Sequence, residues 1–240
     1  MIPLTTTFSA MMSAFLLSTG VIGSSHMQPP EKVVTIAEAD VDSENNENDI
    51  RQEFIPPVSQ GDVVNIGNLR CTIGFVNKDY IITSAHCNKD GVGAHAYQHG
   101  VHIGTVIAQP NLANEDYGWI NNVSHDWTVI KLKENIYAGG NVYSNKNTTH
   151  ISFDEVSIGD TVCSYGYTSK KVSCGRVEDK RHQVLYTDDT SKQSGDSGGP
   201  MWIPGKGFVG LYYGTTKGGT HSISVPLKNR VPYNFLVGEL

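Results

Sequence analysis

The residue with the clearest chemical signal is Ser197, in the turn Gly195-Asp196-Ser197-Gly198-Gly199-Pro200. A serine between glycines on a tight turn can project its hydroxyl into a cleft, because glycine allows backbone angles and close approaches that a side chain forbids. The backbone N–H groups of Gly195 and Ser197, aimed at one point, can also bind a developing oxyanion. The hexapeptide alone fits a glycine-rich surface turn as well, so its chemistry depends on partners elsewhere in the chain.

A general base for such a serine is available in His86, within Thr83-Ser84-Ala85-His86-Cys87. The residues before it predict two strands, 71–76 and 80–83, and a histidine at the end of a strand is held in place. Three of the other histidines cluster in a glycine-rich segment, where we expect them to decorate a surface hairpin rather than to bind a metal: His95, His99 and His102.

The third candidate is Asp126, which opens a β-rich run continuing through Val129, Ile130 and Leu132. A carboxylate buried beside a histidine ring accepts the Nδ1–H hydrogen bond and fixes the tautomer of the ring. Asp116 competes for this role, since it also precedes an aromatic residue and a glycine. We favour Asp126 because a core strand follows it.

The elements that position these residues are predicted to be strands. The chain has 240 residues, 38% of them hydrophobic, with 25 glycines and 10 prolines, which favours short strands joined by turns in one large all-β domain or two small ones. A short C-terminal helix is expected within 229–237, limited by Pro232 to its first turn. The other predicted strands are 101–110, 159–163, 172–177, 207–214 and 221–227.

The N-terminal quarter of the chain differs from the rest in amino-acid composition. Residues 1–23 contain a short apolar core typical of a signal peptide, with an uncleaved anchor as the alternative. Residues 24–57 are polar and hold eight carboxylates between Glu31 and Glu53, as expected for an acidic propeptide or leader of a zymogen. From Phe54 onward 16 acidic and 16 basic residues balance, and no basic stripe suggests a nucleic-acid partner.

Four cysteines, at 71, 87, 163 and 174, permit three pairings. Local pairing, Cys71 with Cys87 and Cys163 with Cys174, is the simplest choice and implies an oxidising compartment; reduced, buried cysteines are the alternative. No His/Cys cluster has the spacing of zinc ligands, so no metal and no cofactor are expected.

Three segments in this order, Thr83–Cys87, Asp126 with its strand, and Gly195–Pro200, resemble the chymotrypsin-like serine proteases. Residues 162–175 and 218–221 are closer to the bacterial streptogrisin and α-lytic branch. The resemblance covers residues 58–240, taken as the protease domain. It implies two six-stranded antiparallel β-barrels with the site between them, His86 and Asp126 from the first and Ser197 from the second.

The resemblance also implies roles. Ser197 would be the nucleophile, His86 the base, Asp126 the residue that orients the ring, and the N–H groups of Gly195 and Ser197 the oxyanion hole. Asp196 would be a buried structural carboxylate whose partner is a cut N-terminus in the trypsin branch and an internal arginine in the bacterial branch. The segment Val58–Gly61 matches such a terminus poorly, which leaves the activation route open.

Specificity is predicted less sharply. Trypsin-like enzymes carry aspartate six residues before the nucleophile, where this chain has Ser191, which disfavours Arg or Lys before the scissile bond. His221, after Gly218-Gly219-Thr220, is either part of the pocket or a core strand residue. We expect small-to-medium polar or acidic residues to be preferred. The candidate pocket residues are Ser191, Lys192, Ser194, Tyr213, Gly214 and His221, with the register of the strand 211–214 open by one residue.

These observations predict a secreted, monomeric serine endopeptidase that hydrolyses protein or peptide substrates through an acyl-enzyme and keeps no stable membrane association after signal cleavage. One alternative is a catalytically inactive protease-like binding protein or toxin, although all three triad candidates are present. Another is a different acyl hydrolase with a Gly-x-Ser-x-Gly elbow, which the all-β texture and the early histidine contradict.

Overall fold

The computed structural model describes residues 56–110, 123–144 and 149–237, and the structural statements below concern these residues. The predicted signal segment 1–23 and nearly all of the predicted leader 24–57 lie outside them. Within the described residues no helix is long and apolar enough to cross a membrane.

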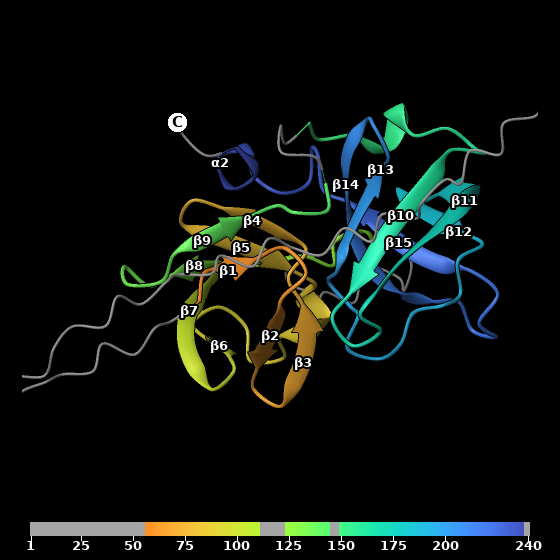
Figure 1. The fold of residues 1–240 in the computed structure, drawn as a ribbon. Helices are drawn as coiled ribbons and strands as arrows, with labels where there is room; N and C mark the ends of the chain where they lie inside the picture. The colour runs from red at the N-terminus through yellow and green to blue at the C-terminus, as the bar shows by residue number, and fades with distance from the viewer. Residues whose placement is uncertain (1–55, 111–122, 145–148, 238–240) are drawn as a thin grey trace, which may run out of the picture. The chain divides into compact units, whose positions relative to one another are not determined.

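The first sheet has seven strands in the order β3-β2-β6-β7-β8-β5-β4. Its two end strands, β3 and β4, are separated in the chain by only Ile73 and Gly74, so they are the two halves of one bent strand and the sheet returns on itself (Figure 1). The sheet is a half-barrel, open between β3 and β4, which is consistent with the first of the two predicted barrels and is called the first barrel below. Its strands are β2 (Val63–Ile66), β3 (Leu69–Thr72), β4 (Phe75–Asn77), β5 (Tyr80–Thr83), β6 (His95–Gln98), β7 (Val101–Ala108) and β8 (Thr128–Leu132).

The second sheet is a closed six-stranded barrel in the order β10-β11-β12-β15-β14-β13. All its pairs are antiparallel, and β13 closes the ring by pairing with β10. The fold class is therefore the predicted one. The strands are β10 (Thr161–Gly166), β11 (Lys171–Arg181), β12 (Val184–Thr187), β13 (Pro200–Ile203), β14 (Gly207–Thr215) and β15 (Ser222–Pro226).

Alternating apolar side chains give each barrel its own core and also join the two barrels. One cluster fills the first barrel, with Ile81 and Ile130 fully buried, and another fills the second, around Leu185. A third cluster takes side chains from both, including Ile82 of β5 and Leu211 of β14. The barrels thus share an apolar contact, and the loops around it can meet across their boundary.

The smaller elements are a parallel pair of short strands, β1 (Val58–Ser59) and β9 (Ala138–Gly140), two 3-10 turns, η1 (Ala85–Cys87) and η2 (Phe153–Glu155), and the helix α2 (Tyr233–Leu236). The short C-terminal helix predicted within 229–237 is present, and Pro232, which was expected to limit it to its first turn, is its N-cap residue. Proline is unfavourable inside a helix but is well tolerated at its start, where the missing N–H would have no partner.

Both locally paired disulfides are present. Cys71–Cys87 joins β3 to η1, and Cys163–Cys174 joins directly opposite positions of β10 and β11. No free cysteine is found in the described chain.

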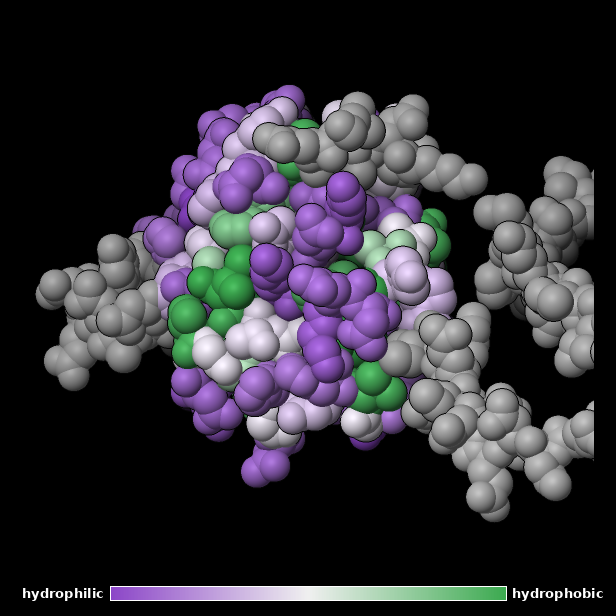
Figure 2. Space-filling view, turned by 90° about the vertical axis from the view of Figure 1, so that its left-hand side faces the viewer, coloured by the Kyte–Doolittle hydropathy of each residue, from purple (hydrophilic) through white to green (hydrophobic). Residues whose placement is uncertain are grey.

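Large hydrophobic side chains are exposed at scattered positions, among them Val92, Tyr137 and Tyr233. On the face drawn in Figure 2, hydrophobic residues form small patches between hydrophilic ones.

Candidate active site

His86 and Asp126 meet because their strands are paired. His86 lies in η1, just after β5, and Asp126 lies two residues before β8; β5 and β8 are antiparallel with Thr83 opposite Thr128. The end of β5 and the beginning of β8 therefore lie at the same edge of the first barrel. This edge is where both polar side chains emerge.

Asp126 makes two hydrogen bonds with His86. One carboxylate oxygen, Oδ1, accepts the backbone N–H of His86 at 2.7 Å, and the other, Oδ2, lies 2.8 Å from Nδ1 of the ring. Asp126 is 1% exposed, whereas the side chain of His86 is 36% exposed. A carboxylate at Nδ1 favours the tautomer with the proton on Nδ1, which leaves Nε2 as an acceptor facing outward.

The disulfide next to His86 restrains the residue and does not offer a metal site. The Sγ atoms of Cys71 and Cys87 lie with the His86 ring within a cluster of potential ligand atoms, all within 4.8 Å of one another. Both sulfurs are bonded to each other, and a metal requires the free thiolate.

Ser197 lies in the turn before β13 and packs on the first barrel. Its carbonyl accepts the N–H of Thr72 at 2.8 Å, and a side chain at the next residue, Gly198, would clash with Thr83 and Ser84. The Ser197 hydroxyl donates to the Tyr213 carbonyl at 3.2 Å. The Tyr213 ring in turn packs edge-on against His86, with ring centroids 5.1 Å apart. The serine and the histidine thus contact the same residue from the two barrels.

Two backbone N–H groups in this turn have no acceptor among the described residues. The N–H groups of Asp196, Gly198 and Gly199 donate to carbonyls of Gln193, Tyr212 and Asp196. Those of Gly195 and Ser197 do not, and Gly195 has a φ of 96°, which favours glycine. Two unpaired donors beside a serine hydroxyl have the composition of an oxyanion hole.

Asp196 is fully buried and is held by backbone amides. Its Oδ1 accepts the N–H groups of Thr168 and Ser169, both at 2.9 Å, and its Oδ2 accepts the N–H of Gln193 at 2.8 Å. Val58, the suggested cut terminus, lies instead in β1, where its N–H donates to Tyr137. Neither partner expected from the resemblance is used in the described chain.

Comparison with solved structures places this geometry in a known fold. The structure is similar to Thermobifida fusca protease A (22% identity, 73% of this chain and 96% of that chain, TM-score 0.53) and to Nocardiopsis protease (18%, 75% and 97%, 0.54). It is also similar to a glutamic acid-specific serine protease described as using a histidine triad in substrate binding (19%, 71% and 94%, 0.51). The fold is that of the chymotrypsin-like serine proteases. No protein-family model and no curated protein matches the sequence.

The register of β14 decides which of its residues contact Ser197 and His86. Tyr212 pairs with Ser224 and Gly214 with Ile223, so Tyr213 is the extra residue of a β-bulge. Bulges redirect a side chain next to active sites. This one turns the Tyr213 ring toward His86 and its carbonyl toward Ser197, and it settles the register that the sequence left open.

The predicted pocket residues Ser191 and Lys192 are engaged by the protein itself. The hydroxyl and N–H of Ser191 both donate to Oδ1 of Asp189, at 2.7 and 3.0 Å. The buried Lys192 ammonium donates to the carbonyls of Lys171 (2.9 Å) and Ser164 (3.2 Å). Burial lowers the pKa of Lys192, opposed in part by the charges of Asp189 and Asp196.

Asp189 is the residue that the sequence did not single out. Its carboxylate is half-buried, and burial raises its pKa, but hydrogen bonds from Ser173 and Ser191 outweigh burial and leave the pKa below the ordinary value. The only signal for it was the pair of carboxylates, Asp188 and Asp189, shortly before Ser191.

His221 lies outside a core strand, and both of its ring nitrogens have partners within the protein. It precedes β15, its side chain is 33% exposed, and its Nε2 lies 2.7 Å from Oε2 of Glu178. Its Nδ1 lies 2.9 Å from the Thr220 hydroxyl. The interpretation of His221 as a core residue was therefore wrong. Ser194 is exposed.

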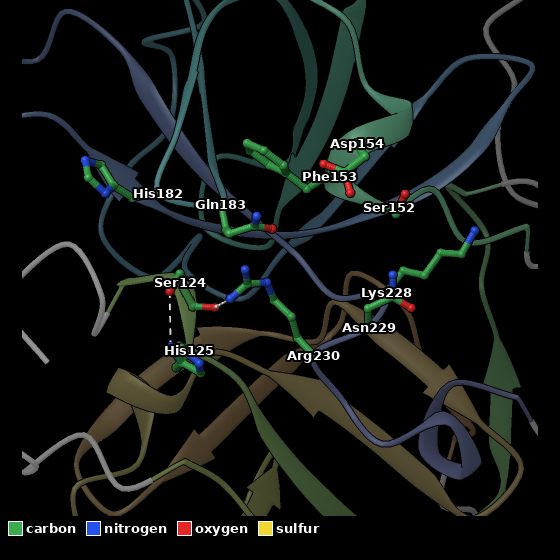
Figure 3. A pocket seen from close by; sticks show the side chains of 10 residues that line it. All are labelled: Ser124, His125, Ser152, Phe153, Asp154, His182, Gln183, Lys228, Asn229 and Arg230. Carbon is green, nitrogen blue, oxygen red and sulfur yellow. Dashed lines mark hydrogen bonds between the residues drawn. The ribbon is translucent and has the colours of Figure 1, made fainter.

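A cavity of about 410 Å³ lies apart from these groups (Figure 3). Arg230 projects into it and donates to the Ser124 carbonyl at 2.7 Å. It includes His125, the neighbour of Asp126, but neither His86 nor Ser197. Its lining residues are Ser124, His125, Ser152, Phe153, Asp154, His182, Gln183, Lys228, Asn229 and Arg230.

Proposed function

We propose that this protein is a serine endopeptidase in which Ser197, His86 and Asp126 form the catalytic triad. The observation that carries the proposal is the doubly hydrogen-bonded pair of His86 and Asp126. Tyr213 connects this pair to Ser197, because its ring packs against His86 and its carbonyl accepts the Ser197 hydroxyl. The fold shared with bacterial serine proteases supports the same chemistry.

The reaction begins when the Ser197 hydroxyl turns from the Tyr213 carbonyl to Nε2 of His86. The ring takes the proton as Oγ attacks the substrate carbonyl carbon, and the resulting oxyanion accepts the N–H groups of Gly195 and Ser197. The imidazolium, stabilised by Asp126, then gives the proton to the leaving amine, and an acyl-enzyme remains. A water molecule, deprotonated by His86, hydrolyses this ester and restores Ser197.

The residue before the scissile bond is proposed to be small to medium-sized, polar and uncharged. An acidic side chain loses support because three of its four suggested receptors, Ser191, Lys192 and His221, already hydrogen-bond within the protein. The fourth, Ser194, is exposed. Arg or Lys would find the Asp189 carboxylate already hydrogen-bonded by serines. Cleavage rates on matched peptides with Gln, Glu or Arg at this position test the ranking, and a dominant rate for Arg or Glu would contradict it.

We further propose a secreted, monomeric zymogen with a signal segment at 1–23 and a propeptide ending near residue 57. Two disulfides favour an oxidising compartment. Val58 is buried and pairs with β9, and the Gln60 side chain bonds to Gly74 and Ser144, so removal of either residue would disturb the first barrel. N-terminal sequencing should therefore find active protein beginning no later than Val58.

The decisive experiment is the variant Ser197→Ala, which should lose peptide hydrolysis and covalent labelling by a fluorophosphonate. The exposed serine variant Ser157→Ala should keep both. If Ser197→Ala were still labelled, the nucleophile would be another residue. If the wild-type protein were folded but neither labelled nor active after maturation, the alternative of an inactive binding protein would replace this proposal.

A further inference from the structure

A second cluster of chemically active side chains lies on the outer face of the β6–β7 hairpin. The two strands are joined by His99 and Gly100, both with positive φ (49° and 85°), as in a tight two-residue hairpin turn. His95 and Tyr97 are exposed, and the residues that alternate with them, Ala96 and Gln98, are buried, so both exposed side chains lie on the outer face. His102 lies opposite Tyr97.

The register of the hairpin brings two imidazole rings together. His95 shares the outer face with Tyr97, and His102 lies opposite Tyr97, so the two histidines are diagonal neighbours across the hairpin. Nδ1 of His95 lies 2.9 Å from Nε2 of His102, and the ring centroids are 4.5 Å apart with planes at 88°. The carbonyl oxygen of Gly104 is a third potential metal ligand, 3.0 Å from the same Nε2. In such a pair one nitrogen carries the shared proton and the other presents a lone pair.

This spacing is the one required by neighbouring ligands of a transition metal. Two imidazole nitrogens, each about 2.1 Å from one ion, lie about 3.0 Å apart when the angle at the metal is 90°. That angle is typical of square-planar and tetragonal coordination, which Cu²⁺ and Ni²⁺ favour with nitrogen and oxygen ligands. The two ring nitrogens are therefore already at the right distance, and the rings need only rotate so that both lone pairs point at one ion.

We propose that His95 and His102 form a surface binding site for a divalent transition-metal ion, with Cu²⁺ bound more tightly than Ni²⁺ or Zn²⁺. The metal replaces the proton shared by the two rings, and the Gly104 carbonyl and water complete the coordination. The order of affinity follows from the general preference of nitrogen sites for Cu²⁺. The proposal uses neither His86 nor Ser197 and is independent of the proposed peptidase activity.

The test is a Cu²⁺ titration by calorimetry and electron paramagnetic resonance on untagged full-length protein. Ser197→Ala prevents self-cleavage, and His26→Gln removes the histidine of the N-terminal segment. One Cu²⁺ per chain with coupling to two nitrogens is expected. Either His95→Gln or His102→Gln should weaken binding at least tenfold, while His182→Gln, in a remote turn, should not.

Circular dichroism spectra must show that each variant is folded, so that a loss of binding is read as a loss of ligands. Coupling to a single nitrogen would overturn the proposal. So would equal binding by folded His95→Gln, or a loss that is equally large in His182→Gln.

Discussion

Replacing Asp126 with asparagine should abolish the proposed peptidase activity through the tautomer of His86. The aspartate accepts two hydrogen bonds from this one residue, at 2.7 Å from the backbone N–H and at 2.8 Å from Nδ1. Asparagine has a single side-chain oxygen, so its NH₂ group must occupy one of the two positions. If it faces the backbone N–H, two donors meet in a site that is 1% exposed, at a cost of about 1–3 kcal/mol.

The favoured arrangement of Asp126→Asn therefore keeps the oxygen on the backbone N–H and turns the NH₂ group to Nδ1. Nδ1 must then accept a hydrogen bond, and the ring proton moves to Nε2. In this tautomer Nε2 has no lone pair for the proton of Ser197. The wrong tautomer costs roughly 10⁴ in turnover, which corresponds to about 5.4 kcal/mol in the activation barrier.

The assay is steady-state hydrolysis of a chromogenic peptide, combined with nitrogen NMR of the His86 ring. We expect a 10⁴-fold loss of turnover, an unchanged melting temperature within a few degrees, and a proton on Nε2. Asp116→Asn is the matched control, since Asp116 is the rival candidate and lies outside the described residues. A loss of less than tenfold for Asp126→Asn, or the large loss in Asp116→Asn, would refute the assignment.

Three further changes probe the surroundings of the site. Gly198→Ala should abolish activity and lower the melting temperature, because φ is +81° and a Cβ would clash with Thr83. Near-normal activity would show that the turn can change conformation to accept the methyl group. Lys192→Met should reduce the free energy of unfolding in urea by about 1–3 kcal/mol, since two carbonyls lose their donor; an unchanged value would mean that water replaces the ammonium. Burial lowers the pKa of His150, so the unfolded chain binds a proton first as pH falls. The free energy of unfolding should then drop below about pH 6.5 by up to about 1.4 kcal/mol per pH unit, and His150→Phe should lack this contribution. If urea titrations gave the wild type and the variant the same dependence of unfolding free energy on pH, the prediction would be contradicted.

The candidate triad could be predicted from sequence because each member sits in a short segment with its own signal. His86 follows a strand and precedes a cysteine, Asp126 opens a core strand, and Ser197 lies among glycines. The strand pattern likewise follows from alternation and turn residues. The pairing of β5 with β8 then brings His86 and Asp126 to one edge, as expected for neighbouring antiparallel strands.

The surroundings of the triad could not be predicted, because they depend on pairs that are distant in the sequence. The bulge at Tyr213 depends on the register between β14 and β15. The partner of His221 is Glu178, which is 43 residues away in the sequence and lies in β11. Local sequence places each of these residues near the site. Whether a residue is available to a substrate depends on the partner with which it already interacts inside the protein.

Asp196 shows the same limit in its strongest form. The resemblance offered two charged partners for this carboxylate, and both have a recognisable sequence signal. The structure instead provides three backbone N–H groups, from Thr168, Ser169 and Gln193. Three such donors satisfy the hydrogen-bonding capacity that a buried carboxylate must fill. Every residue except proline has this donor, so side-chain types do not reveal the partner. It depends on the path of the chain between β10 and β11 and just before Asp196.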